Sequence, residues 1–291
     1  MEDHFSKYEI DNLISSIRRG APLHPPLRSK FAVTTKRLLK KAEVLTVTSQ
    51  ILAQQCAAQL AEYENAVDEQ WVKDIAEEIE WWWVWTISKI QSGDIRLWKE
   101  FASKPFPFEK YVTEESKALR ILNIGCGPRS TLGLKSKNRH LMVDNMDPLA
   151  LAYNFIMNGL GVVIGEPIKF GAVEILRKLD IPYKYDFISA KNCLDHAYDV
   201  PKGLDELVSI LDKKGVILLE HYENEAESQN YLGLHKWNIE IRNGRIHVWS
   251  KIIDEYFDHK SYGLKLRHER EIRNKGSGVP HPFVTIFLER L

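Results

Sequence analysis

The feature that most constrains the fold is an apolar run that ends abruptly in a glycine turn. Residues 121–124 read Ile-Leu-Asn-Ile and lead directly into Gly125-Cys126-Gly127-Pro128. An acidic segment with Asp144 and Asp147 follows about 20 residues later. A buried strand that ends on glycines lets its backbone approach a ligand, and an acid after the next strand can bind the two hydroxyls of a ribose. The pairing predicts an α/β domain that binds a nucleoside.

The glycine turn also limits which nucleoside compound fits. In the motif Gly-x-Gly-x-x-Gly, the glycines and the following helix N-terminus cradle the pyrophosphate of a dinucleotide. The third glycine of that motif is missing here. The turn therefore favours a nucleoside cofactor without a phosphate, and S-adenosylmethionine fits that description.

The charge balance argues against broad classes of partner. The 291 residues include 40 Lys and Arg and 40 Asp and Glu, so the chain has no net field to recruit nucleic acid or an anionic membrane. Enzymes that flip a nucleic-acid base out of the helix and methylate its amino group carry the signature Asn/Asp-Pro-Pro-Tyr/Phe. That signature is absent here. Cys56, Cys126 and Cys193 form no CxxC pair, and no apolar signal region follows Met1, which together predict a cytoplasmic protein.

Two parts follow one another along the chain: residues 1–112 are expected to be helical, and residues 113–291 to form an α/β domain. In the first part we expect a helix near residues 10–17, a Pro-rich linker over residues 22–26, a long helix from about residue 31 to a break at 65–68, and an apolar helix over residues 71–90 that ends at Gly93. Trp81, Trp82, Trp83 and Trp85 cover more than one face of that last helix. They either pack against the α/β domain or form a wall over an acceptor site.

Short apolar runs alternate with amphipathic segments in the second part, which is typical of a parallel sheet with crossover helices. We expect parallel strands at residues 120–124, 140–146, 162–164, 185–190 and 215–220, a helix at 201–211, and a tight turn at Lys213-Lys214-Gly215. Asn243-Gly244 predicts a hairpin between residues 237–242 and 245–250. Residues 264–272 and 283–289 are expected to close the sheet as an antiparallel pair. The predicted fold is therefore a Rossmann-like, seven-stranded α/β sheet with an N-terminal helical region.

The glycine turn, the acid after the second strand and Lys213-Lys214-Gly215-Val216 resemble class I S-adenosylmethionine-dependent methyltransferases over residues 115–291. Asp147-Pro148-Leu149-Ala150, Asn192-x-Leu194-Asp195-His196 and residues 221–238 resemble a bacterial branch of that family, which includes proteins linked to surface-glycan and small-molecule modification. One departure is Asn123, because many class I enzymes carry an acid there.

The resemblance implies a cofactor site of S-adenosylmethionine at the ends of the first four strands. Asp147 is the first choice for the ribose hydroxyls and Asp144 the second, although Asp147-Pro148 is also an ordinary helix start. The resemblance also implies that Glu174 lies beside the edge of the adenine ring. Alternatively, Glu174 is a solvated acid on the surface of a helix. The full set of expected cofactor residues is Asn123, Gly125, Cys126, Gly127, Pro128, Asp144, Asp147, Leu149, Ala172, Val173, Glu174, Asn192 and Cys193.

The expected catalytic residues follow the fourth and fifth strands. Asp195 and His196 come after the fourth strand, His221 and Glu225 after the fifth, and His235 lies in the loop beyond. A histidine with a neighbouring carboxylate can take a proton near neutral pH. Alternatively, Asp195 caps the next helix and His221 is a hydrogen-bonded core residue. The side chains of Asp195, His196, His221 and Glu225 are also chemically able to bind a divalent cation. Their spacing in the sequence is not diagnostic of a metal site, so no metal ligand is assigned.

The leading functional hypothesis is methyl transfer to oxygen on a small-molecule or glycan-type acceptor. An N-methyltransferase is the nearest alternative and would be marked by an acidic or aromatic cage rather than a base. A protein that binds the cofactor without catalysis is a third possibility. A basic cluster in the helical part is interpreted as a solvated face, with contact to a phosphate-bearing acceptor as the alternative; it comprises Lys36, Arg37, Lys40 and Lys41.

Overall fold

The computed structural model describes most of the chain, with short gaps. The described ranges are residues 26–64, 69–91, 104–111, 118–128, 130, 132–160, 162, 166–274 and 279–291, and for residues 26–42 and 91 only the backbone is described. Several expectations lie outside these residues: the helix near residues 10–17, the break at 65–68, the helix end at Gly93, and the side chains of Lys36, Arg37, Lys40 and Lys41.

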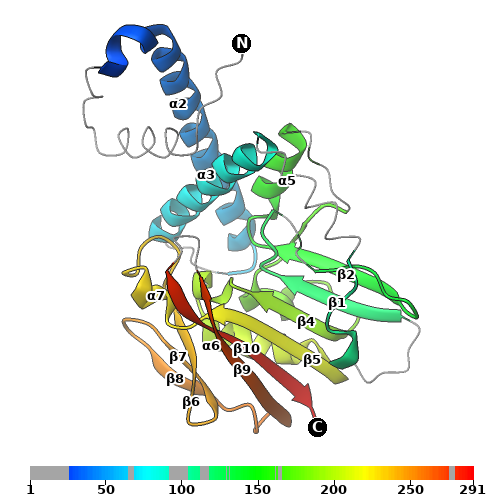
Figure 1. Cartoon of the computed structure of the whole chain (residues 1–291). Helices are drawn as coiled ribbons and strands as arrows, with labels where there is room; N and C mark the ends of the chain where they lie inside the picture. Colours follow the sequence, from blue (N-terminus) through cyan, green and yellow to red (C-terminus); the bar gives the residue numbers. More distant parts are fainter. Residues whose placement is uncertain are drawn as a thin grey trace.

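Two long helices precede the sheet. Helix α2 spans Pro26–Ala61 and α3 spans Glu69–Gln91. Helix α2 begins earlier than expected, at Pro26 itself, because a proline fits the first helical turn, where its missing N–H has no partner to lose. Ile75 and Ile79 of α3 are fully buried and pack with α2 and with the later helix α5, Ala150–Gly159. The N-terminal half of α2 extends away from the rest of the molecule (Figure 1).

A seven-stranded sheet forms the centre of the molecule, with strand order β3-β2-β1-β4-β5-β10-β9. Strands β1 to β5 are parallel, and β10 lies antiparallel between β5 and β9. The strands are β1 Ala118–Ile124, β2 His140–Asp147, β3 Lys169–Phe170, β4 Tyr185–Lys191, β5 Leu211–Tyr222, β9 Leu264–Asn274 and β10 Pro280–Arg290. The predicted Rossmann-like α/β fold, with five parallel strands and a closing antiparallel pair, is confirmed.

The third strand and the start of the fifth differ from the prediction. The strand that pairs with β2 is Lys169–Phe170; Val162 is not in a strand, and residues 163–165 lie outside the described part of the chain. Strand β5 begins at Leu211, so Lys213 to Gly215 form an irregularity within the strand rather than a turn before it. A two-residue strand has too few side chains to give a periodic pattern, and a run of charged residues within a strand looks like a turn.

A smaller antiparallel sheet follows β5 in the sequence. The predicted hairpin forms β6, Asn238–Arg242, and β7, Arg245–Trp249, and a third strand, β8, Asp254–Phe257, pairs with β7. Strand β8 was not predicted because its four residues are exposed or half-buried and show no apolar alternation. The short helical elements are η1 Glu109–Tyr111, η2 Val173–Lys178, η3 Leu194–His196, α6 Val200–Ser209 and α7 Glu225–Ser228.

Successive residues of the central strands face opposite sides of the sheet. Leu122 and Ile188 pack on one side with α6 and the small sheet, whereas Ile121 and Phe187 pack on the other side with the segment around Phe106. Helices α3 and α5 lie beside the carboxyl ends of the parallel strands (Figure 1). Because both faces of the sheet are covered by packed side chains, this edge is where a ligand can reach the strands.

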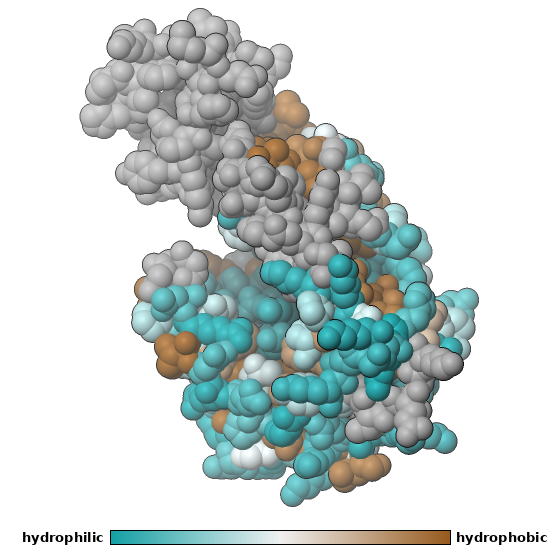
Figure 2. Space-filling model, turned by 45° about the vertical axis from the view of Figure 1, so that its right-hand side comes forward, coloured by the Kyte–Doolittle hydropathy of each residue, from teal (hydrophilic) through white to brown (hydrophobic). Residues whose placement is uncertain are grey.

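Figure 2 shows a largely hydrophilic surface over the sheet in that view, with hydrophobic residues beside the helices. Every helix within the described ranges is too short or too polar to cross a bilayer.

Candidate functional site

A cavity of about 420 Å³ lies at the carboxyl ends of the parallel strands. Its walls come from α3, from the segments that follow β1, β2, β3 and β4, and from the loop around His235. Nine of the thirteen expected cofactor residues line it: Gly125, Gly127, Asp147, Leu149, Ala172, Val173, Glu174, Asn192 and Cys193. The other four, Asn123, Cys126, Pro128 and Asp144, do not. The nine residues that line the cavity lie between Gly125 and Cys193 in the sequence, and the parallel strands bring them to one edge of the sheet.

Two glycines give the turn after β1 its shape. Gly125 and Gly127 have φ angles of +62° and +63°, a conformation that L side chains rarely adopt. A Cβ on Gly125 would lie 2.4 Å from the Cβ of Cys193, so the chain after β4 packs directly on this glycine. A Cβ on Gly127 would lie 3.5 Å from the Trp82 ring of α3. The turn is therefore held between α3 on one side and the chain after β4 on the other.

Asp147 braces the turn and also faces the cavity. Its Oδ2 accepts a hydrogen bond from the Gly127 N–H at 2.9 Å, and its Oδ1 accepts one from the Leu149 N–H at 2.9 Å. Burial raises the pKa of Asp147 to about 6; the two N–H donors and His196 lower it, and Glu78 raises it. Helix α5 begins at Ala150, so Asp147 is not the helix cap of the alternative interpretation. Each carboxylate oxygen retains an acceptor site for a ligand.

Asp144 and Asn123 are used inside the protein instead. Asp144 accepts hydrogen bonds from Lys169, from Tyr183 at 2.6 Å and from Tyr185 at 2.8 Å. Burial raises the pKa of Asp144, but these donors outweigh it and hold the pKa below its usual value. The Asn123 amide donates to Ser130 and to Asn145. Neither residue lines the cavity, so the second choice for the ribose acid lies away from the site.

Glu174 is buried, so its alternative interpretation as a solvated acid is wrong. Its Oε1 accepts hydrogen bonds from the backbone N–H of Tyr198 at 2.7 Å and of Asp199 at 3.3 Å. Burial raises the pKa of this carboxyl to about 7, although the backbone donors oppose the rise. Glu174 therefore fixes the cavity wall that Tyr198 forms.

Asp195, His196 and His235 form a compact cluster at the cavity wall. The His235 Nδ1 lies 2.6 Å from Asp195 Oδ2, the His196 Nε2 lies 3.4 Å from the same oxygen, and the two ring nitrogens are 3.2 Å apart. Burial lowers the pKa of His196, but the surrounding carboxylates together outweigh this and hold the pKa above its usual value; Asp195 contributes most, followed by Glu78, Glu225 and Asp147. Asp199, not Asp195, caps helix α6. The capping alternative for Asp195 is therefore wrong.

The other two expected catalytic residues do not reach the cavity. His221 and Glu225 are buried but do not line it. Burial lowers the pKa of His221 to about 4, and neither of its ring nitrogens has a hydrogen-bond partner among the described residues. The prediction that all four side chains converge on one acceptor site is thus corrected: within the described ranges, His196 lines the cavity, with Asp195 directly behind it.

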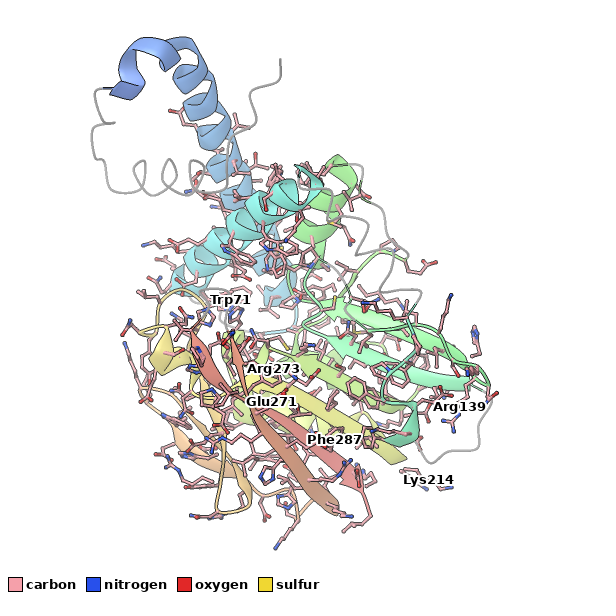
Figure 3. All side chains as sticks on the ribbon, viewed as in Figure 1. Trp71, Arg139, Lys214, Glu271, Arg273 and Phe287 are labelled. Atoms are coloured by element: carbon pink, nitrogen blue, oxygen red, sulfur yellow. The ribbon has the colours of Figure 1, made fainter. Side chains whose placement is uncertain are left out.

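The tryptophans of α3 divide between the two roles considered from the sequence. Trp81 and Trp82 line the cavity, as does Trp71, near the N-terminal end of α3 (Figure 3). Trp83 instead packs edge-on against Phe155 of α5, with the ring centroids 5.9 Å apart, and Trp85 packs beside Met157. Part of α3 is therefore cavity wall, and part is packing.

Glu78 is a charged residue of the cavity that sequence reasoning did not assign to it, and His235, noted from the sequence only for its place in the loop beyond the fifth strand, lines the cavity as well. Glu78 lies one helical turn before Trp82, and its Oε1 accepts a hydrogen bond from the Trp82 indole N–H at 2.7 Å. The available signal for Glu78 was its position inside the apolar stripe of α3. No lysine or arginine of the described residues lines the cavity, whereas Glu78, Asp147 and Glu174 do. The cavity therefore disfavours a strongly anionic ligand.

Comparison with known proteins gives similarity at the level of solved structures. No family model matches the chain, and no curated protein matches it. A SAM-dependent methyltransferase from Methanosarcina mazei is 14% identical, with a TM-score of 0.39, over 65% of this chain and 99% of that one. A phosphoethanolamine N-methyltransferase from Haemonchus contortus is 11% identical (TM-score 0.41; 62% and 51% of the two chains), and the CurJ carbon methyltransferase is 15% identical (TM-score 0.43; 89% and 71%).

Proposed function

We propose that the chain is an S-adenosylmethionine-dependent methyltransferase whose cofactor binds in the cavity at the strand ends. The observation that carries this proposal is the joint position of the Gly125–Gly127 turn and the Asp147 carboxylate on one cavity wall. A glycine turn with an acid after the next strand suits a nucleoside, and a cavity without lysine or arginine suits one that carries no phosphate.

The residues present fit such a cofactor. Asp147 has free acceptor sites for two ribose hydroxyls, and its own backbone hydrogen bonds hold it in place. Ala172, Val173 and Tyr198 supply an apolar and aromatic wall for the base. Glu78 and Trp82 stand over the turn, where a negative carboxylate and a ring face favour a positive charge. When bound, S-adenosylmethionine supplies a methyl group on a positively charged sulfur.

For the acceptor we propose a neutral small molecule or glycan unit that is methylated on oxygen. His196 and His235 line the cavity with Asp195 directly behind His196, and this cluster is suited to hold a hydroxyl and to draw off its proton. The aromatic rings of Trp71, Trp81 and Trp82 of α3 line the same cavity. N-methylation is the second candidate, and the pairing of Glu78 with Trp81 and Trp82 favours it, because an acid among aromatic rings binds an amine well.

Calorimetry with S-adenosylmethionine and S-adenosylhomocysteine tests the proposal. We expect both to bind the purified chain at one site. If neither compound binds under conditions where the protein is folded by circular dichroism, the proposal is wrong. If both compounds bind, transfer of a labelled methyl group from S-adenosylmethionine into a small-molecule extract identifies the acceptor by mass spectrometry.

The affinity for S-adenosylhomocysteine is expected to fall as the pH drops from 7.5 to 5. The Asp147 carboxyl, with a pKa of about 6, gains a proton in this range and loses the charge that strengthens its hydrogen bonds to the ribose. Below pH 6 the loss is expected to approach about tenfold for each pH unit. Glu78 and His196 also face Asp147, so the matched control is Asp147→Asn: a variant that retains the full pH dependence would show that another group causes it.

A further inference from the structure

We propose that Asp195 Oδ2, His196 Nε2 and His235 Nδ1 form a binding site for a divalent transition-metal cation in the cavity wall. The binding of the cation does not depend on the proposed function, but its use in methyl transfer rests on that function. Among the described residues, these three form the group of His, Cys, Asp and Glu side chains whose ligand atoms all lie within 4.8 Å of one another.

The spacing of the three atoms suits one cation. Their separations are 2.6, 3.4 and 3.2 Å. The circle through them has a radius of about 1.8 Å, so a cation can lie about 2.1 Å from all three, which is the usual zinc–nitrogen and zinc–oxygen distance. Two imidazoles and one carboxylate are ligands that zinc and its neighbours in the first transition row prefer. Three protein ligands leave a coordination position open, and both histidines line the cavity.

Hydrogen bonds alone satisfy this triangle poorly. If His235 donates its Nδ1 proton to Asp195, the His196 Nε2, at 3.2 Å, has only that same shared proton to accept. If His196 also carries a proton on Nε2, both N–H groups converge on the one Asp195 oxygen, and the bond from His196 is long, at 3.4 Å. A cation in place of the protons gives each of the three atoms a partner.

Two further observations point to a ligand at this position. Asp195 is 3% exposed, and its Oδ1 has no hydrogen-bond partner among the described residues. His221 is 2% exposed, interacts electrostatically with Asp195 and His196, and has no partner on either ring nitrogen within the same residues. Buried polar atoms normally have partners, so unpaired groups gathered around one cluster suggest that something binds there.

The backbone holds the cluster in place independently of the side chains. The Lys236 N–H donates to the Asp195 carbonyl at 2.9 Å, and the Trp237 N–H lies 3.3 Å from the same oxygen. The His196 N–H donates to the Cys193 carbonyl at 3.1 Å. The chain after β4 and the loop around His235 are thus bound together, so the three ligand atoms stay close without a cation. A site prepared in this way binds a cation with little rearrangement.

The test is a titration of the purified full-length chain, freed of metal by chelation, with Co²⁺ and Zn²⁺ in separate experiments. We expect one equivalent to bind in calorimetry and Co²⁺ to develop the visible absorption of a site with nitrogen and oxygen ligands. His235→Ala is expected to weaken binding by more than about 100-fold, since loss of an outer-shell partner alone costs about 10- to 100-fold. The matched control is His268→Ala, which removes an exposed imidazole from β9.

The proposal is overturned if neither metal binds saturably, or if folded His196→Ala and His235→Ala bind Co²⁺ as the unchanged protein does. Should those variants unfold, imidazole ¹⁵N resonances of the unchanged protein decide: Zn²⁺ must shift those of two histidines. A negative result leaves proton removal by His196 as the role of the cluster. Binding of S-adenosylhomocysteine to the metal-free protein is measured separately, so failure of the cofactor proposal is distinct from failure of the metal site.

Discussion

Asp147→Ala is expected to weaken S-adenosylhomocysteine binding by about 100-fold or more, while the protein stays folded. The carboxylate is proposed to accept hydrogen bonds from two ribose hydroxyls, and bonds to a charged group contribute about 1.5–3 kcal/mol each. About 3 kcal/mol in total corresponds to a factor of more than 100 in the dissociation constant. Calorimetry measures the affinity, and thermal unfolding checks that the variant is native.

Asp144→Asn is the matched control for this prediction. Asp144 is an acid on the same strand that is occupied by Lys169, Tyr183 and Tyr185 away from the cavity. Its replacement is expected to lower stability and to leave the affinity within about twofold, because no ligand contact is lost. The opposite pattern, with affinity lost in Asp144→Asn and kept in Asp147→Ala, would move the ribose site by three residues and contradict the assignment.

Gly125→Ala is expected to destabilise the protein by about 3 kcal/mol or more and to abolish cofactor binding. The new Cβ would lie 2.4 Å from the Cys193 Cβ, and the φ angle of +62° is itself unfavourable for alanine. Either the turn after β1 or the chain after β4 must move, and both line the cavity. Urea unfolding measures the loss of stability, and calorimetry measures the loss of binding.

Gly244→Ala separates the two causes of this effect. Gly244 also has a positive φ angle, +70°, but nothing lies within 4 Å of the Cβ it would gain. Its replacement by alanine is expected to lower the free energy of unfolding by about 1–2 kcal/mol, the cost of the positive φ angle alone, and to leave cofactor binding unchanged. The double variant Gly125→Ala with Cys193→Gly should recover part of the stability. Equal losses for Gly125→Ala and Gly244→Ala would show that the contact with Cys193 has no influence.

The two sheets were largely predictable because most of their strands carry their own pattern. Strands β1, β2 and β4 are apolar runs, and the hairpin of β6 and β7 has a turn that only Asn-Gly and similar pairs favour. Strand β3 has two residues, and β8 has no apolar alternation, so neither has a local signal. Their strand character comes from the neighbours with which they pair.

The cofactor wall was more predictable than the acceptor wall for a topological reason. Residues after β1, β2 and β3 reach the same edge because parallel strands end there, so their order in the chain fixes their place. Glu78 reaches the cavity because α3 crosses that edge, and His235 because its loop is bound to Asp195. The apolar stripe of α3 marks the helix face that carries Glu78 but not the surface that this face meets, and no local pattern places His235. His221 is the penultimate residue of β5 and yet lies outside the cavity, so position at the end of a strand does not fix which side a side chain faces.

The absence of lysine and arginine from the described cavity wall has a consequence for selectivity in a mixed pool of adenosine compounds. ATP and NAD share the adenosine part of S-adenosylmethionine but carry several negative charges, whereas S-adenosylmethionine carries a net positive one. The carboxylates of Asp147 and Glu78 repel the first two and attract the third. The cavity wall thus discriminates between adenosine compounds by their charge. Abundant anionic nucleotides are expected to compete poorly for this site even though their sugar and base would fit it.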